Sequence, residues 1–252
     1  MSFLGFPPPL NSRALLIAAV HTLNMTTPTC YMCSAPKTSV EHVPPRGLFP
    51  KTKDLPPGVN LRKQLITVPS CEIHNTEKSA DDEYLMYALV FGIQNNVTAS
   101  SHIRTKITRA FTSNPAVPRL ITQHPRPVRV EDTSTGKIEE TMALRINTHR
   151  VHQALDHIGR ALHFHHFREK WTADIQVIPL FLLALDGESA LKFNDTLASM
   201  GVAAEALFSD QPAHGNNPEV FSYRVVQLRD HISAAMLLDF YEGSKVVLLF
   251  KK

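Results

Sequence analysis

The sequence is poor in cysteine, with three in 252 residues, and it has no apolar run long enough to form a transmembrane helix. Three cysteines cannot close a disulfide framework, so we expect a reducing compartment and interpret the protein as cytoplasmic. The longest apolar segments, residues 14–20 and 177–185, are far shorter than the roughly 20 residues that a membrane span needs. No membrane partner is therefore expected.

The residues after 115 lack a Gly-rich phosphate loop, a nucleophile elbow and a dinucleotide-binding fingerprint, so they indicate no activity of their own. Their hydrophobic patterns still predict structure. We expect a hairpin over 126–146, an amphipathic helix over 148–171, a strand over 175–185, a helix over 187–207 and strands at 219–228, 233–241 and 244–250. Residues 115–252 are thus predicted to form an α+β accessory domain with an antiparallel sheet.

The N-terminal residues 1–25 have a weak resemblance to a signal peptide, but the run Pro7–Pro9 and the lack of a small-x-small cleavage site argue against one. Met25 offers an alternative start. We therefore interpret residues 1–25 as an extension that is either not native or disordered.

The net charge of +3 is unevenly distributed along the sequence. Residues 26–80 hold seven basic and four acidic residues, whereas residues 81–252 hold eighteen and nineteen. The positive excess therefore lies on the segment that contains the cysteines, as expected if that segment contacts a polyanion.

The three cysteines belong to two pairs of potential metal ligands with the same gap. Cys30 and Cys33 form the first pair, and 37 residues separate it from Cys71 and His74. Tetrahedral zinc prefers four sulfur or nitrogen ligands, and paired ligands on short loops supply them. The spacing predicts a structural zinc site.

Proline is frequent between residues 26 and 70, which excludes long helices there and leaves short strands and loops, with 61–69 as the best strand candidate. From Ser79 the pattern changes. A serine cap, acids in the first turn and apolar residues at helical spacing predict a helix over 79–93, and a second helix is expected at about 101–112.

An acid-histidine pair, Glu41 and His42, follows Cys33 by eight residues and precedes Pro44, while Asn75 and Lys78 follow His74. This order resembles the zinc-bearing members of the HNH endonuclease family, and the resemblance covers about residues 28–85. It implies a zinc-stabilised ββα-metal module over residues 26–114 that binds one catalytic divalent metal.

The resemblance also implies roles for individual residues. Glu41 and Asn75 would hold the catalytic metal, which would be Mg²⁺, Mn²⁺ or Ni²⁺, because hard cations prefer oxygen ligands. His42 would be the general base, since a neutral imidazole can activate water near pH 7. Lys78 and Arg46 would hold backbone phosphates. DNA is favoured over RNA as the substrate, a bacterial or phage origin and a role in defence are expected, and an oligomer is left open.

The sequence departs from the family at the middle Asn, which relatives commonly place five residues before the third cysteine. Ile66 occupies that position, and Asn60 lies eleven residues before Cys71. In the family this Asn braces the loop that carries the catalytic histidine. We therefore expect either Asn60 or another group to brace that loop here.

Two alternatives from other classes remain. One is a zinc-stabilised nucleic-acid-binding protein without catalysis, and the other is an interaction or oligomerisation protein in which zinc is purely structural. Histidines at 149, 152, 157, 163, 165 and 166 make a second metal site geometrically possible, but a polar or nucleic-acid-facing surface is favoured. The acidic residues at 81–83 are interpreted as the first turn of a helix, where the helix dipole favours them.

Overall fold

The computed structural model describes residues 28–76, 78–114, 125–132, 135–229 and 231–252. The extension predicted for residues 1–25 lies outside this part of the chain. Among the residues that are described, no helix has both the length and the apolar character needed to cross a membrane.

The described residues form a mixed α+β structure in which every paired strand runs antiparallel to its neighbour. The strands are β1 (Ser39–Val43), β2 (Ile66–Ser70), β3 (Arg126–Asp132), β4 (Lys137–Ala143), β5 (Ile175–Pro179), β6 (His214–Asn217), β7 (Phe221–Gln227), β8 (Ile232–Phe240) and β9 (Ser244–Lys251). The helices are α1 (Glu72–Thr76), α2 (Ser79–Val90), α3 (Val97–His102), α4 (Thr108–Ser113), α6 (Thr148–Phe167) and α7 (Ala190–Phe208). Two 3₁₀ turns, η1 (Arg46–Leu48) and η2 (Thr52–Asp54), and a π-helical segment, η3 (Ile103–Ile107), complete the described elements.

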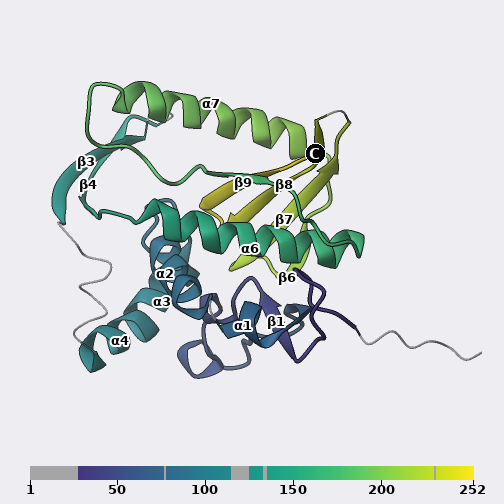
Figure 1. Ribbon diagram of the computed structural model, residues 1–252. Coiled ribbons are helices and arrows are strands. Elements are labelled where there is room, and N and C mark those ends of the chain that lie inside the picture. The colour runs from purple at the N-terminus through teal and green to yellow at the C-terminus, as the bar shows by residue number, and fades with distance from the viewer. Residues whose placement is uncertain (1–27, 77, 115–124, 133–134, 230) are drawn as a thin grey trace, which may run out of the picture.

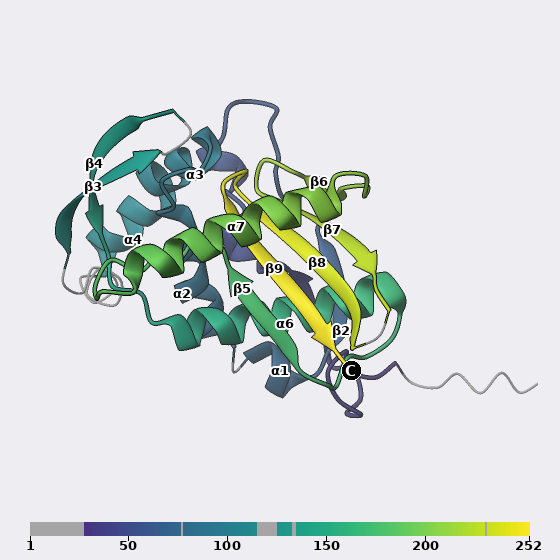
Figure 2. The same ribbon diagram turned by 90° about the horizontal axis from the view of Figure 1, so that it is seen from above.

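A five-stranded sheet in the order β5-β9-β8-β7-β6 lies between two long helices, with α7 over one face and α6 over the other (Figure 1). The alternation of side chains along β9 produces this arrangement. Val246, Leu248 and Phe250 belong to the core on the α6 side, whereas Val247 and Leu249 contact the α7 side. Seen from above, α7 crosses the strands of the sheet (Figure 2).

Helix α6 confirms the predicted helical spacing, because its apolar stripe is fully buried. The stripe comprises Val151, Leu155, Ile158 and Leu162. The Asn147 side chain caps the helix by accepting a hydrogen bond from the Arg150 amide, and the helix ends at Arg168, whose left-handed φ of 61° stops it. Besides the sheet, α6 packs on α2, β1 and β2. The helix therefore joins the large sheet to the N-terminal part of the chain.

The N-terminal part contains the short elements that the prolines predict. Strands β1 and β2 pair in a register that sets Glu41 opposite Val68 and His42 opposite Thr67. The predicted strand at 61–69 is shorter and later than expected, because residues 61–64 form turns. α1 follows β2 directly, and α2 follows α1, so the local order is strand, strand, helix.

The C-terminal predictions agree with the structure in type and differ mainly at boundaries. The hairpin is β3–β4, the strand expected at 175–185 ends at Pro179, and α7 begins three residues later than expected. The helix expected at 101–112 is divided into α3, η3 and α4, and β6 was not predicted.

One cluster of buried residues extends from Cys30 to Phe250 and so includes side chains from both predicted domains. The turn between β8 and β9 is one contact point. Tyr241 and Glu242 have left-handed φ angles of 53° and 57°, and Tyr241 is fully buried. Its carbonyl accepts a hydrogen bond from the Asn96 amide, between α2 and α3. The division at residue 115 stays a prediction, but the two parts share their core.

Candidate metal centre and adjoining cavity

The four predicted zinc ligands come together in one cluster. Nδ1 of His74 lies 3.4 Å from Sγ of Cys30 and 3.3 Å from Sγ of Cys71, and the Cys33 and Cys71 sulfurs are 3.9 Å apart. In a tetrahedral site with bonds of 2.0–2.3 Å, ligand atoms are separated by roughly 3.5–3.8 Å. The cluster could therefore bind a metal ion such as zinc, and no other group of this kind occurs in the described residues.

Local backbone contacts explain why these four side chains meet. The loop that carries Cys30 and Cys33 is closed by a hydrogen bond from the Cys30 amide to the Ala35 carbonyl, and the Tyr31 amide donates to Pro69 at the end of β2. Cys71 directly follows β2, and His74 lies one turn later in α1. A strand end and one helical turn thus bring the second ligand pair to the first.

The electrostatic environment of Cys30 favours its ligand form. Burial alone raises the pKa of a thiol, but hydrogen bonds from the amides of Met32, Cys71 and Cys33 and from His74 outweigh burial and lower the pKa of Cys30 to about 6. The thiolate is the form that binds metals.

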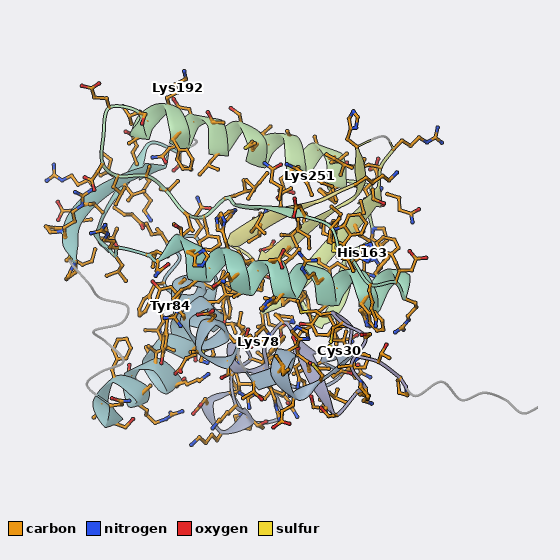
Figure 3. The ribbon with its side chains drawn as sticks, viewed as in Figure 1. Cys30, Lys78, Tyr84, His163, Lys192 and Lys251 are labelled. Carbon is orange, nitrogen blue, oxygen red and sulfur yellow. The ribbon has the colours of Figure 1, made fainter. Side chains whose placement is uncertain are left out.

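A cavity of about 370 Å³ opens beside the cluster. Its lining includes Glu41, His42, Arg46, Asn75 and Lys78. The structure therefore brings together all five residues that were expected to act on a nucleic acid. Lys78 and Cys30 lie on the same side of α6 (Figure 3).

Glu41, Lys78 and Asp82 form a buried ionic group in this cavity. The Lys78 ammonium lies 2.6 Å from Oε1 of Glu41 and 2.9 Å from Oδ2 of Asp82, and Glu41 and Lys78 are each only 4% exposed. Burial raises the pKa of both carboxyls, and Lys78 opposes this. Oε2 of Glu41 and Oδ1 of Asp82 are buried, and neither has a hydrogen-bond partner among the described residues.

The position of Lys78 bears on its expected role. An ammonium enclosed by two carboxylates is not directed at solvent, so it would have to leave Glu41 before it could contact a phosphate. Arg46, by contrast, is exposed at the cavity and can reach an incoming anion without rearrangement.

His42 and Asn75 line the same cavity, where one offers an imidazole and the other a carboxamide. His42 is half-buried, and burial together with Arg46 and Arg62 lowers its pKa, so its imidazole is neutral at pH 7. The Asn75 NH₂ group donates to Oγ of Ser39 at 3.1 Å, which leaves its carbonyl oxygen as the free acceptor. The cavity thus contains a base and several oxygen ligands of the kind that a hard cation prefers.

Three side chains hold the loop that follows His42 by donating hydrogen bonds to three consecutive backbone carbonyls. Lys106 donates to Gly47 at 2.7 Å, Tyr241 donates to Leu48 at 2.6 Å, and Arg62 donates twice to Phe49 at 2.9 and 2.7 Å. These donors come from η3, the β8–β9 turn and the segment before β2. We call these contacts the loop clamp.

The loop clamp answers the question raised by the displaced Asn. Asn60 accepts a hydrogen bond from the Arg62 amide at 2.9 Å, and so it supports a turn rather than the loop itself. The side chain of Arg62 contacts the loop directly. The bracing role is thus distributed over three residues that sequence reasoning did not identify.

No protein-family model, curated protein or solved structure matched the chain. The site is accordingly interpreted from its own geometry.

The histidine-rich segment of α6 is partly a core element. His163 is buried, its Nδ1 lies 3.0 Å from the Glu169 carbonyl, and its ring packs against Trp171 and Phe250. His163 therefore does not belong to the polar or nucleic-acid-facing surface that the sequence favoured for this stretch.

The role of Asp82 has a signal in the sequence. It lies four residues after Lys78 on one helix face, a spacing that favours an ion pair. Lys106 and Tyr241 lie 59 and 193 residues from the carbonyls that they contact, and no local pattern reveals such a contact.

Proposed function

We propose that the protein is a metal-dependent endonuclease of the HNH type that hydrolyses phosphodiester bonds in DNA. The observation that carries this proposal is the single cavity that contains Glu41, His42 and Asn75 next to the closed Cys/His cluster. Zinc at the cluster requires none of these three residues. The local order of two antiparallel strands followed by a helix also supports a ββα module.

Glu41 and Asn75 fit a catalytic divalent cation. In the part of the chain that the structure describes, Oε2 of Glu41 is buried without a partner, and Asn75 uses its NH₂ group to bind Ser39 while its carbonyl oxygen accepts no hydrogen bond. When bound, such a cation supplies charge stabilisation to a phosphate and to a departing oxygen. Mg²⁺, Mn²⁺ and Ni²⁺ are the ions to test.

His42 is proposed as the general base that takes a proton from the attacking water. The lowered pKa of His42 keeps the imidazole in the form that can accept this proton at pH 7. No hydrogen bond engages its ring within the described residues, so both nitrogens are accessible to water. The loop clamp holds residues 47–49, which follow His42 by five to seven residues.

Cleavage assays with supercoiled and linear DNA, with RNA as a comparison substrate, test this proposal. Wild type should cut with at least one of Mg²⁺, Mn²⁺ or Ni²⁺ and not in EDTA. His42→Ala should lose about 10²- to 10⁴-fold in rate, the usual contribution of a general base. Thr67→Ala is the matched control, because Thr67 is the exposed cross-strand partner of His42 and should leave the rate unchanged.

Zinc content must be measured on each preparation, so that a misfolded variant is not taken for an inactive one. The proposal fails if wild type with full zinc does not cut with any cation, or if His42→Ala cuts as fast as wild type.

A second candidate function is favoured by one observation, the contact between Lys78 and Glu41. An ammonium held between two carboxylates can replace a divalent cation permanently. The protein would then be a zinc-stabilised nucleic-acid-binding protein without catalysis. It would bind DNA in a salt-sensitive way and would cut with none of the cations.

A further inference from the structure

Lys106 lies at a special point of the backbone. It belongs to η3, a π-helical segment between α3 and α4, and such wider turns occur frequently at functional sites. Its side chain lines the same cavity as Glu41 and His42, although it comes from outside the segment that carries the motif.

The ammonium of Lys106 is incompletely satisfied. It has three N–H donors, of which one contacts the Gly47 carbonyl at 2.7 Å and one contacts Sδ of Met86 at 2.9 Å. A thioether sulfur is a weak acceptor. Within the described residues no carboxylate lies within ion-pair distance of Lys106, in contrast to Lys78, which has two.

A partly buried cation without a counter-ion costs free energy in the unliganded protein. Burial, with a further contribution from Arg62, lowers the pKa of Lys106 to about 8. The groups that influence this pKa include Arg62 and Lys51, which lower it, and Glu83 and Asp54, which raise it. An anion at the cavity wall would offset the cost of burial, because it favours the charged form of the lysine.

The charges around the cavity leave room for an anion once a metal is bound. Its lining contains three acidic side chains, Glu41, Asp82 and Glu83, and three basic ones, Arg46, Lys78 and Lys106. These charges balance, so a divalent cation makes the cavity positive. A phosphodiester carries the single negative charge that suits such a site.

We propose that the Lys106 ammonium binds a non-bridging phosphate oxygen of the nucleic-acid backbone inside the cavity, next to His42. The identity of the anion rests on the proposed function, but the binding step does not require cleavage. Lys106 would then make two contacts at the same place. It donates a hydrogen bond to the Gly47 carbonyl, and it would bind the phosphate beside that carbonyl.

Binding of a fluorescein-labelled DNA duplex, followed by fluorescence anisotropy with Ca²⁺ as the hard divalent cation at several salt concentrations, tests this contact. Lys106→Met keeps the length of the side chain and removes its charge. The slope of log affinity against log salt should become shallower by about 0.9, as for the loss of one phosphate contact, and the affinity at low salt should fall roughly tenfold. Lys106→Arg should restore both.

Arg104→Met is the matched control, because Arg104 is exposed on the same segment and does not line the cavity. It should keep the wild-type slope. An equal loss in Arg104→Met, or a wild-type slope in Lys106→Met, would overturn the proposal and leave Lys106 with a structural role.

A second measurement tests the proposal without Lys106→Met, in case that variant folds poorly. The affinity of wild type should fall by more than that of Lys106→Arg between pH 7 and 9, because arginine keeps its charge in this range. Equal pH dependence would overturn the proposal.

If wild type binds DNA with a Lys106-dependent slope but never cuts, the nuclease proposal fails and the phosphate contact stands. If wild type does not bind DNA, both fail.

Discussion

The Cys/His cluster and the cavity are adjacent in sequence at His74 and Asn75, but they are built in different ways. The cluster uses four ligands from residues 30–74, which a loop closure, a strand end and one helical turn bring together. The cavity depends on side chains as distant as Lys106, and its loop also depends on Tyr241. The possible metal site is thus built from local contacts, whereas the cavity depends on contacts between residues that are distant in sequence.

The two regions also differ in how many of their buried polar atoms have a hydrogen-bond partner. The cluster atoms contact one another, but in the cavity one carboxylate oxygen of Glu41 and one of Asp82 are buried and have no partner among the residues that the structure describes. Unpaired buried polar atoms destabilise a protein unless a ligand or water satisfies them. The cluster is therefore suited to stability and the cavity to binding.

Loss of the cluster should have the largest effect. Cys71→Ser replaces a thiolate by a poor zinc ligand, and zinc contributes about 10 kcal/mol or more to the folding of small zinc modules. That is comparable to the whole stability of a typical domain. We expect loss of bound zinc and unfolding of the N-terminal region, detected by metal analysis and thermal unfolding.

His74→Cys provides the control for this change, because four cysteines also form a good zinc site. It should keep both the metal and the unfolding temperature. A metal-free Cys71→Ser protein with wild-type stability would mean that the cluster has no structural metal.

Removal of the Lys78 charge from the cavity should have the next largest effect. Lys78→Met leaves Glu41 and Asp82 buried without a counter-ion, which typically costs about 3–5 kcal/mol. Urea unfolding should detect this loss, while zinc content stays unchanged. Lys53→Met, at an exposed position, serves as the control and should be neutral.

Added Mn²⁺ sharpens the same comparison. If the two carboxylates can hold a divalent cation, Mn²⁺ should stabilise Lys78→Met more than wild type, because the ammonium no longer competes. Equal stabilisation of both proteins would count against a cation site at these carboxylates.

The free energy of unfolding should depend on pH through His102, which contacts the Tyr241 side chain of the loop clamp. His102 is fully buried beside Tyr241, with its Nδ1 3.2 Å from the Tyr241 hydroxyl, and burial with nearby Lys106 and Arg62 lowers its pKa from 6.5 to about 4. Between these values the unfolded chain takes up a proton that the folded protein does not. The free energy of unfolding should therefore fall as the pH decreases, by about 2 kcal/mol between pH 7 and 5.

His102→Asn isolates this contribution, since acid also releases zinc from both proteins. The difference in unfolding free energy between wild type and variant should shrink by that amount between pH 7 and 5. A difference that does not change with pH would show that His102 is not the titrating group.

The sequence predicted the cluster because ligand spacing is local information. It predicted α6 and the strands β8 and β9 because periodicity reports which face of an element is buried. The loop clamp could not be predicted, since its carbonyl acceptors have no side-chain signature and two of its donors are distant in sequence. β6 was missed because His214–Asn217 is short, polar and bulged against β7.

The β8–β9 turn has a consequence for how this protein can change over generations. Tyr241 inserts from the last hairpin to hold Leu48, and a side chain at Gly243 would collide with the Gln94 carbonyl. Gene rearrangements that separate the first 114 residues from the final hairpin would leave the loop after His42 without its tyrosine. The N-terminal part and the β8–β9 hairpin are thus expected to be inherited together, and the N-terminal part is a poor candidate for transplantation into other proteins.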